Sequence, residues 1–451
     1  MVDNLSCFKR HLKQCDLVVI SCSATPLMVI CGNKGAIIVA NLRTRKERQR
    51  YFVAIISHIY VPVDGLFLCF LCRVREYQCF RLIYLIMDSI DELSFKCVER
   101  WTKKYSKNDY RLFWEGNYYD SDVHDCAELT TETLTVLVRK CVNVLAENGV
   151  TSDTQLALYL PALIQMPIAA LAAIRIGAAF LPISAMEESV DELSALLKQS
   201  SCEVIVSVDG FWSGKRLIRT KEIIDDAIAN QENRCRRLLV VRHVTPNEGV
   251  PPPQKHILAR RPYYLYKVNM QEGRDSWWSE FFARATTECK IATIDESAVA
   301  LLQPVRNQQG LSLVKRSRAE LRKEIENLEQ HIDASGVCFV MCTNDAYIAI
   351  VAMLAALHSS APLLIFEGIV SYPDFSRISQ IINKYEVKTM IVSEIDLNLV
   401  LDNEMYARMW NTATLTKIII LGEDIAVAAR ASTLFGVPCE TLAPPFHNTI
   451  H

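Results

Sequence analysis

The sequence predicts an α/β protein from residue 92 onward, with parallel sheets flanked by helices. Short apolar runs there alternate with amphipathic segments of helical period, and Gly and Pro stand at the ends of these segments. The 451 residues are 50% hydrophobic and 22% charged, the balance of a folded protein with a sizeable core. Strand, helix and strand at this spacing form βαβ units, which require a parallel sheet.

The elements expected up to residue 241 begin with a short strand and turn over 112–116. A helix over 130–148 follows, with Leu134, Val138 and Leu145 on its apolar side, and it closes at Gly149. The remaining elements alternate regularly: strands over 156–160, 180–183, 204–208 and 238–241, and helices over 165–176, 190–199 and 221–229.

The second half of the chain continues this pattern after a loop over 245–262, which contains three consecutive prolines. A charged amphipathic segment predicts a surface helix over 314–332. Tyr372-Pro373-Asp374 is expected to open a further helix. The strands expected in this half cover 298–302, 363–366, 389–392 and 417–421.

Residues 1–91 form a separate segment with long apolar runs but no regular alternation of strand and helix. None of these runs reaches the ~18 uninterrupted apolar residues of a spanning helix. The segment therefore stays unassigned, with membrane association or a non-native origin as alternatives. Cys69, Cys72 and Cys79 lie among apolar neighbours, and no second CxxC follows them. A role as buried apolar side chains is therefore favoured over zinc binding, and no metal site is expected.

Charge and motifs narrow the classes of function. The net charge of −2 and the pI near 6.5 give no basic field for nucleic acid, so none is expected as a partner. No GxxxxGK[ST], GxGxxG, GxSxG or HExxH occurs. No cleavable signal begins at Met1, which favours reduced thiols and a cytoplasmic location, with the nucleus as the alternative.

Several segments carry a family resemblance in one consistent order. They are SFKCVERW (94–101), RLFWEGNYY (111–119), residues 144–180, CEVIVSVDG (202–210), RDSWWSEFF (274–282), FVMCTND (339–345), FEGIVSYPD (366–374) and LGED (421–424). Together they resemble the acetyl-CoA synthetases, a branch of the adenylate-forming enzymes. The resemblance implies that residues 92–451 are the incomplete large N-terminal domain of such an enzyme, without its small C-terminal domain.

The same resemblance implies a reaction and its ligands. Acetate and ATP would form an acetyl-adenylate with release of pyrophosphate, Mg²⁺ would bridge the phosphates, and CoA would then take the acetyl group. Gly422 and Glu423 match the Gly-Glu pair on the adenine side, although a turn carboxylate explains Glu423 equally well. Lys215 matches the CoA-facing loop, but a lone lysine in a loop is more often only solvated.

The phosphate loop of the family should follow the strand that ends at Leu302. Here residues 303–312 read QPVRNQQGLS, in which Pro304 removes an amide donor and one glycine, Gly310, remains. Arg306 and Lys315 could meet a phosphate by charge alone. The chain also ends at His451, before the next family motifs. We therefore expect an inactive or slow enzyme, and no catalytic residue is assigned.

Two other classes of function stay open. One is a binding module that keeps affinity for CoA or adenine nucleotide, or that pairs with an intact synthetase. The other is a fragment without a stable fold, because a doubly wound domain that is cut short exposes sheet edges and apolar surface.

Overall fold

The computed structural model describes residues 28–32 and 35–39 and most of 92–443, apart from 104, 107, 120–123, 187–188, 230–234, 247–266, 290, 293 and 308–309. The chain divides into two compact units, residues 1–91 and 92–451. In the first, β1 (Met28–Gly32) pairs antiparallel with β2 (Gly35–Val39). The CxxC that begins at Cys69 lies outside the described residues. Membrane association was considered for this segment because of its apolar runs, and most of these runs also lie outside the described residues.

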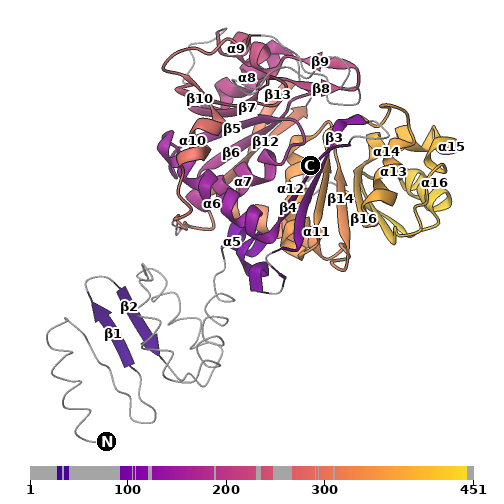
Figure 1. Ribbon diagram of the computed structural model, residues 1–451, viewed down its shortest axis with the longest axis horizontal. Helices are drawn as coiled ribbons and strands as arrows, with labels where there is room; N and C mark the ends of the chain where they lie inside the picture. Colours follow the sequence, from indigo (N-terminus) through magenta and orange to yellow (C-terminus); the bar gives the residue numbers. More distant parts are fainter. Residues whose placement is uncertain are drawn as a thin grey trace, which may run out of the picture. The chain divides into compact units, whose positions relative to one another are not determined.

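The described part of the second unit contains two seven-stranded sheets (Figure 1). The first has the order β11-β10-β7-β5-β6-β12-β13, with β11 Asp275–Trp277, β10 Arg237–Val241, β7 Val204–Val208, β5 Gln155–Leu160, β6 Ala179–Ser184, β12 Val299–Asn307 and β13 Gly310–Ser317. The second has the order β18-β17-β16-β14-β15-β3-β4, with β18 Cys439–Leu442, β17 Lys417–Leu421, β16 Val387–Ser393, β14 Val337–Met341, β15 Leu363–Phe366, β3 Tyr110–Tyr119 and β4 His124–Thr130. In each sheet the strands run parallel except for one antiparallel edge strand, β13 or β4. The predicted α/β fold with mostly parallel sheets is confirmed.

Helices flank the sheets. They are α5 (Leu93–Cys97), α6 (Thr131–Glu147), α7 (Gln165–Ile176), α8 (Val190–Ser200), α9 (Thr220–Ala229), α10 (Trp278–Arg284), α11 (Arg318–Glu329), α12 (Ala346–Ser359), α13 (Arg377–Lys384), α14 (Glu394–Leu401), α15 (Glu404–Ala407) and α16 (Ile425–Phe435). Short pieces complete the unit: the 3₁₀ helix η1 (Glu99–Lys103) and the hairpin strands β8 (Phe211–Ser213) and β9 (Arg216–Ile218). Among the described residues, no helix combines the length and the apolar composition that crossing a membrane requires.

The core lies where the two sheets meet across α12. This helix contacts β6 of the first sheet and β14 and β15 of the second, and Figure 1 shows it between them. Its sequence, AYIAIVAMLAALHS, is apolar on every side, as expected for a helix buried all round. Helix α7 is nearly as apolar and ends at Gly177, whose φ of +89° suits a residue without a Cβ.

Several element boundaries differ from the sequence prediction. Residues 314–317 belong to β13, and the predicted helix begins only at Arg318, because Ser317 and Glu320 form a capping box there. Strand β3 continues to Tyr119 rather than turning at Gly116. Helix α13 begins at Arg377, three residues after the Tyr-Pro-Asp sequence that was expected to open it.

Candidate functional site

The candidate site lies where the carboxyl ends of strands from the two sheets face one another. Among the described residues, two hydrogen-bonded contacts there link the segments after strands of the two sheets, and a third links the second sheet to the β8–β9 hairpin. Nε2 of His243, after β10, lies 2.6 Å from Oε1 of Glu367, after β15. The hydroxyl of Ser184, at the end of β6, donates to the carbonyl of Thr343 at 3.3 Å. Ligands of open α/β sheets bind in crevices at such carboxyl ends.

The third contact is a reciprocal pair between β3 and the β8–β9 hairpin. The amide nitrogen of the Asn117 side chain donates to the carbonyl of Gly214 at 2.9 Å, and the backbone N–H of Gly214 donates to Oδ1 of Asn117 at 2.9 Å. Gly214 has φ of +60°, and a Cβ there would meet the side chain of Ile369 at 2.9 Å. Glycine therefore lets the hairpin turn tightly against the second sheet.

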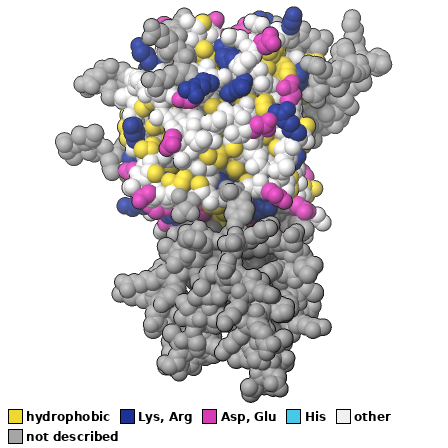
Figure 2. Space-filling view, turned by 90° about the vertical axis from the view of Figure 1, so that its left-hand side faces the viewer, with side chains coloured by type: hydrophobic (Ala, Val, Ile, Leu, Met, Phe, Trp, Pro, Cys, Tyr) yellow, Lys and Arg dark blue, Asp and Glu magenta, His cyan; other side chains and the backbone are white. Residues whose placement is uncertain are grey.

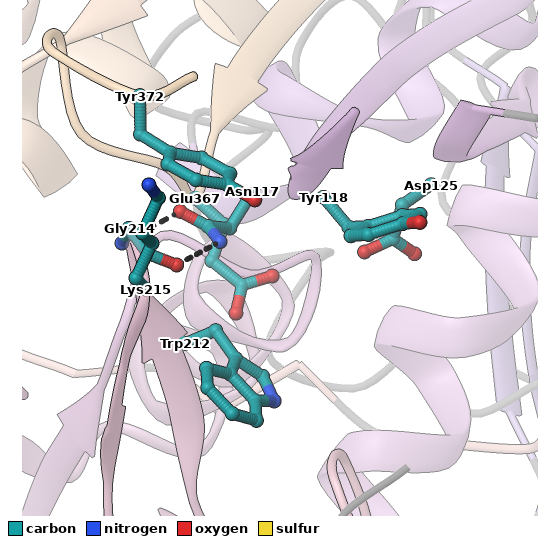
Figure 3. A pocket seen from close by; sticks show the side chains of 8 residues that line it. All are labelled: Asn117, Tyr118, Asp125, Trp212, Gly214, Lys215, Glu367 and Tyr372. Atoms are coloured by element: carbon teal, nitrogen blue, oxygen red, sulfur yellow. Dashed lines mark hydrogen bonds between the residues drawn. The ribbon is translucent and has the colours of Figure 1, made fainter. Parts of the chain in front are cut away.

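A cavity of about 220 Å³ opens beside these contacts (Figure 3). Its lining comes from the second sheet, the segment after β15 and the separate β8–β9 hairpin, and comprises Asn117, Tyr118, Asp125, Trp212, Gly214, Lys215, Glu367 and Tyr372. Glu367 also lines a smaller cavity of about 30 Å³, next to Ser184 and Thr343. The Glu367 carboxylate thus stands between two cavities at the junction of the sheets.

Asp209 holds the loop that carries His243. Its buried carboxylate accepts backbone N–H groups from His243 at 2.9 Å, Val244 at 3.0 Å and Thr245 at 2.8 Å, and from Gly210 at 2.8 Å. A carboxylate with this many backbone donors fixes the loop strongly. The position of His243 against Glu367 therefore depends on Asp209.

Lys215 lies in the turn between β8 and β9 and lines the 220 Å³ cavity. Its side chain is exposed. In Figure 3 it lies with Gly214 on one side of Asn117, whereas Tyr118 and Asp125 lie together on the other. Of the residues that the sequence proposed for ligand binding, Lys215 alone is among those that line this cavity.

Residues 303–307 and 310–312 lie in paired strands of a β-hairpin, where a loop over 303–312 was expected. Strand β12 runs to Asn307 and pairs with β13 from Gly310 onward, with Arg306 opposite Leu311 and Asn307 opposite Gly310. The guanidinium of Arg306 pairs with the Glu192 carboxylate at 2.8 and 2.5 Å. Lys315 is exposed, opposite Leu302.

Gly422 and Glu423 follow β17, at the carboxyl edge of the second sheet. Glu423 is exposed, and its backbone N–H donates to Oε2 of Glu394 at 3.1 Å. The N–H of Asp424 reaches the same oxygen at 3.3 Å. Gly422 gives this carboxylate room, because a Cβ there would lie 2.2 Å from Oε2 of Glu394. An internal carboxylate thus occupies the donors of this turn.

The sequence missed the residues that join the sheets. Glu367 appeared only within the segment FEGIVSYPD, and neither His243 nor Asp209 was singled out. The available signal was position, since Asp209 and Glu367 directly follow an apolar strand and His243 lies two residues after one. Within the described residues, no three His, Cys, Asp or Glu side chains come together in a way that could hold a metal ion.

Comparisons with known proteins agree with this architecture. The family model described as AMP-binding enzyme matches residues 107–279. An acetyl-coenzyme A synthetase of Pyrobaculum aerophilum is 26% identical over 348 residues, which cover 74% of this chain and 48% of that protein. The chloroplastic/glyoxysomal acetyl-coenzyme A synthetase of Arabidopsis thaliana is 23% identical over 75% of this chain and 44% of its own length. An uncharacterized protein of Caenorhabditis elegans is 35% identical over 127 residues, 26% of this chain and 83% of that protein.

The match over residues 107–279 and the mostly parallel sheets flanked by helices are consistent with the N-terminal domain of the adenylate-forming enzymes. The chain is acetyl-CoA synthetase-like, as the order of its sequence segments indicated. The chain spans about half the length of the curated acetyl-CoA synthetases it matches.

Proposed function

We propose that this chain keeps the scaffold of an acetyl-CoA synthetase but forms acetyl-adenylate slowly or not at all. The family reaction would use acetate, ATP with Mg²⁺, and CoA. The proposal rests on residues 303–312, where the family places its phosphate loop and this chain has a paired hairpin.

Phosphate binding in such a loop depends on backbone N–H groups that point at the ligand. In the hairpin, Gln303, Val305 and Arg306 lie in an extended strand paired with β13, in which successive N–H groups point to alternate edges rather than converging on one ligand, and Pro304 has no N–H. Loss of one donor to a developing charge costs roughly 2.7–4 kcal/mol, or about 10²–10³ in rate. Several missing donors would reduce adenylation below detection, and the described residues do not fit MgATP.

The turn on the adenine side supports the same proposal. The carboxylate of Glu394 already accepts the N–H groups of Glu423 and Asp424. A nucleotide that approached this turn would have to displace a negative charge or lie beside it, and either arrangement costs free energy. Gly422 and Glu423 are therefore proposed as remnants of an adenine site rather than as a working one.

A second candidate function is a binding module, and the 220 Å³ cavity with Lys215 favours it. Such a module would hold CoA or an adenine nucleotide without reacting it, or would pair with an intact synthetase. The nine described cysteines form no disulfide. Reduced thiols suit the cytoplasm, where we propose that the protein acts, with the nucleus as the alternative.

Acetate-dependent exchange of pyrophosphate into ATP tests the first proposal directly. We expect no exchange by the purified chain under conditions in which the Arabidopsis acetyl-coenzyme A synthetase exchanges readily. Robust exchange that requires acetate would overturn it. Calorimetric titration with ATP, AMP and CoA tests the second candidate: heat with any of the three supports a binding module, and no heat with all three argues for a partner role.

A further inference from the structure

Exposed apolar side chains gather on three helices of the second sheet. Among the described residues, seven of the ten large apolar side chains that are exposed lie within 395–425. They are Ile395 and Leu399 on α14, Met405, Tyr406, Met409 and Trp410 on and directly after α15, and Ile425 at the start of α16. We call them, with the helices that carry them, the α14–α16 surface. On the side of the molecule that Figure 2 shows, apolar side chains are instead interspersed with charged ones of both signs.

The three helices lie side by side, so their exposed side chains form one surface. Helix α14 contacts both α15 and α16, and Figure 1 shows the three together beside β16. The carboxylate of Glu394 accepts two N–H groups of the turn before α16, so Ile425 lies beside the first turn of α14. Ile395 and Leu399 are one turn apart and share a face of that helix. The surface therefore extends along α14 from Ile425 toward α15.

The extent of this surface distinguishes it from single exposed apolar residues, which are normal on a protein. Each of the seven residues is between 36% and 76% exposed, so together they present several hundred Å². Contiguous apolar patches of this extent on soluble proteins mark sites of interaction. Met405 and Met409 are also flexible and polarizable, and such side chains adapt to the irregular surface of a partner helix.

The charges around the apolar side chains indicate the kind of partner. The exposed or half-buried charged residues of α14, α15, α16 and the turn before α16 are five acids and two bases, which leave three net negative charges at neutral pH. They are Glu394, Asp402, Glu404, Glu423 and Asp424 against Arg408 and Arg430. Both arginines already pair within the surface, Arg408 with Glu404 at 3.5 Å and Arg430 with Asp402 at 2.8 Å. A partner with positive charges is therefore favoured.

The same charges argue against a second copy of this chain as the occupant. Two copies that met through this surface would place their carboxylates opposite one another, and like charges across an interface are unfavourable. Helices with one apolar face bind to apolar surfaces of this kind through side chains three and four residues apart. The remaining requirement is a basic polar face on such a helix.

We propose that the α14–α16 surface docks an amphipathic helix with a basic polar face, supplied by a partner protein. The apolar side of that helix would cover Ile395, Leu399 and Met409, and its lysines or arginines would lie near Asp402 and the turn before α16. The inference is independent of the 220 Å³ cavity, because none of the residues that line the cavity belongs to this surface.

The probe is a peptide of about 14 leucines and lysines with helical period, which as a helix is about 21 Å long. Its controls are the same peptide with glutamate in place of every lysine, and a scrambled peptide of the same composition. Fluorescence anisotropy with the full chain should show the lysine peptide binding at least about tenfold tighter than either control. Added salt should weaken this binding. Hydrogen exchange should show new protection within 394–410 and 423–430.

Variants at exposed positions test the surface without disturbing the core. M409Q and L399Q should each weaken binding of the lysine peptide about fivefold or more. V314Q is the matched control, because Val314 is an exposed apolar residue on β13, and it should leave binding unchanged. D424N keeps a cap for α16 but removes a charge, so it should weaken binding severalfold. D153N removes an exposed charge elsewhere and should have no effect.

Thermal melts of each variant establish that it is folded. Equal binding of the lysine and glutamate peptides, or a loss in V314Q as large as in M409Q, would overturn the inference. Protection confined to other parts of the chain, or no binding of the lysine peptide, would do the same. Sedimentation of the full chain tests the remaining occupant: a dimer that M409Q dissociates would show that a second copy, and not a basic helix, covers this surface.

Discussion

Arg306 forms a two-pronged ion pair with Glu192, with Nη1 at 2.8 Å from Oε1 and Nη2 at 2.5 Å from Oε2. Glu192 lies in the first turn of α8, and Gln199 of the same helix donates to the carbonyl of Leu311 at 3.0 Å. Both strands of the β12–β13 hairpin are therefore fastened to α8. The pair is partly exposed and adds little stability, but Arg306 would have to leave Glu192 before it could contact a phosphate.

The ends of two helices offer a matched test of packing. Gly149 and Gly177 have φ of +88° and +89°, but a Cβ at Gly177 would lie 1.4 Å from Cδ1 of Ile294, whereas nothing lies within 4 Å at Gly149. Gly149→Ala should cost about 1 kcal/mol for the left-handed backbone alone. Gly177→Ala should cost about 1–3 kcal/mol more because Ile294 must move. Urea unfolding of both variants measures the difference, and equal losses would contradict the packing described.

Asp209 offers a test of the loop that carries His243. The Asp209→Ala variant leaves four buried or partly buried backbone N–H groups without their acceptor. Each of these groups that water cannot reach should lower the free energy of unfolding by about 1–3 kcal/mol. We expect a loss of at least about 3 kcal/mol in the free energy of unfolding. Asp295, an exposed aspartate that binds Ser297, is the matched control, and Asp295→Ala should have a far smaller effect. Similar losses for the two variants would show that Asp209 does not fasten the loop.

The regular elements could be predicted because their periodicity is local. Helix α7 and strand β7 have the predicted bounds, and the predicted strand over 363–366 is β15. Residues 314–317 were wrongly assigned to the helix that follows because their sequence resembles its charged sequence. In the structure they pair with strand β12. Pairing of two strands is decided by tertiary contacts, which periodicity does not report.

The candidate site was less predictable for a related reason. The family resemblance led to Lys215 because a loop motif is contiguous in sequence. In contrast, His243 and Glu367 are separated by 124 residues, and nothing local to either indicates the other. The sequence of 303–312 keeps a single glycine, Gly310, but the pairing of Gln303 to Asn307 with a neighbouring strand depended on Gly310 to Ser317.

Glu324 provides a test by pH. Burial raises the pKa of this carboxyl to about 7, and the Tyr347 hydroxyl donates to its Oε2 at 2.8 Å. Because the folded pKa lies above the unfolded one, the protonated form favours folding. The contribution is full below about pH 4.5 and is lost as pH rises through about 7.

Glu324→Gln keeps an acceptor for Tyr347 and removes the titration. It should raise the free energy of unfolding at pH 8 by on the order of 1 kcal/mol, discounted for partial exposure, and change little at pH 4.5. Thermal melts across this range measure the effect. A stability difference between variant and parent that does not change with pH would refute the assignment.

Hydrogen exchange over residues 299–317 tests the central claim most directly. If the β12–β13 hairpin cannot hold a triphosphate, its amides should be protected to the same degree with and without saturating MgATP. The β14 and β16 strands of the second sheet provide the internal reference. New protection confined to 303–312 on addition of MgATP would show that this segment grips the nucleotide, and the account of a scaffold without adenylation would be wrong.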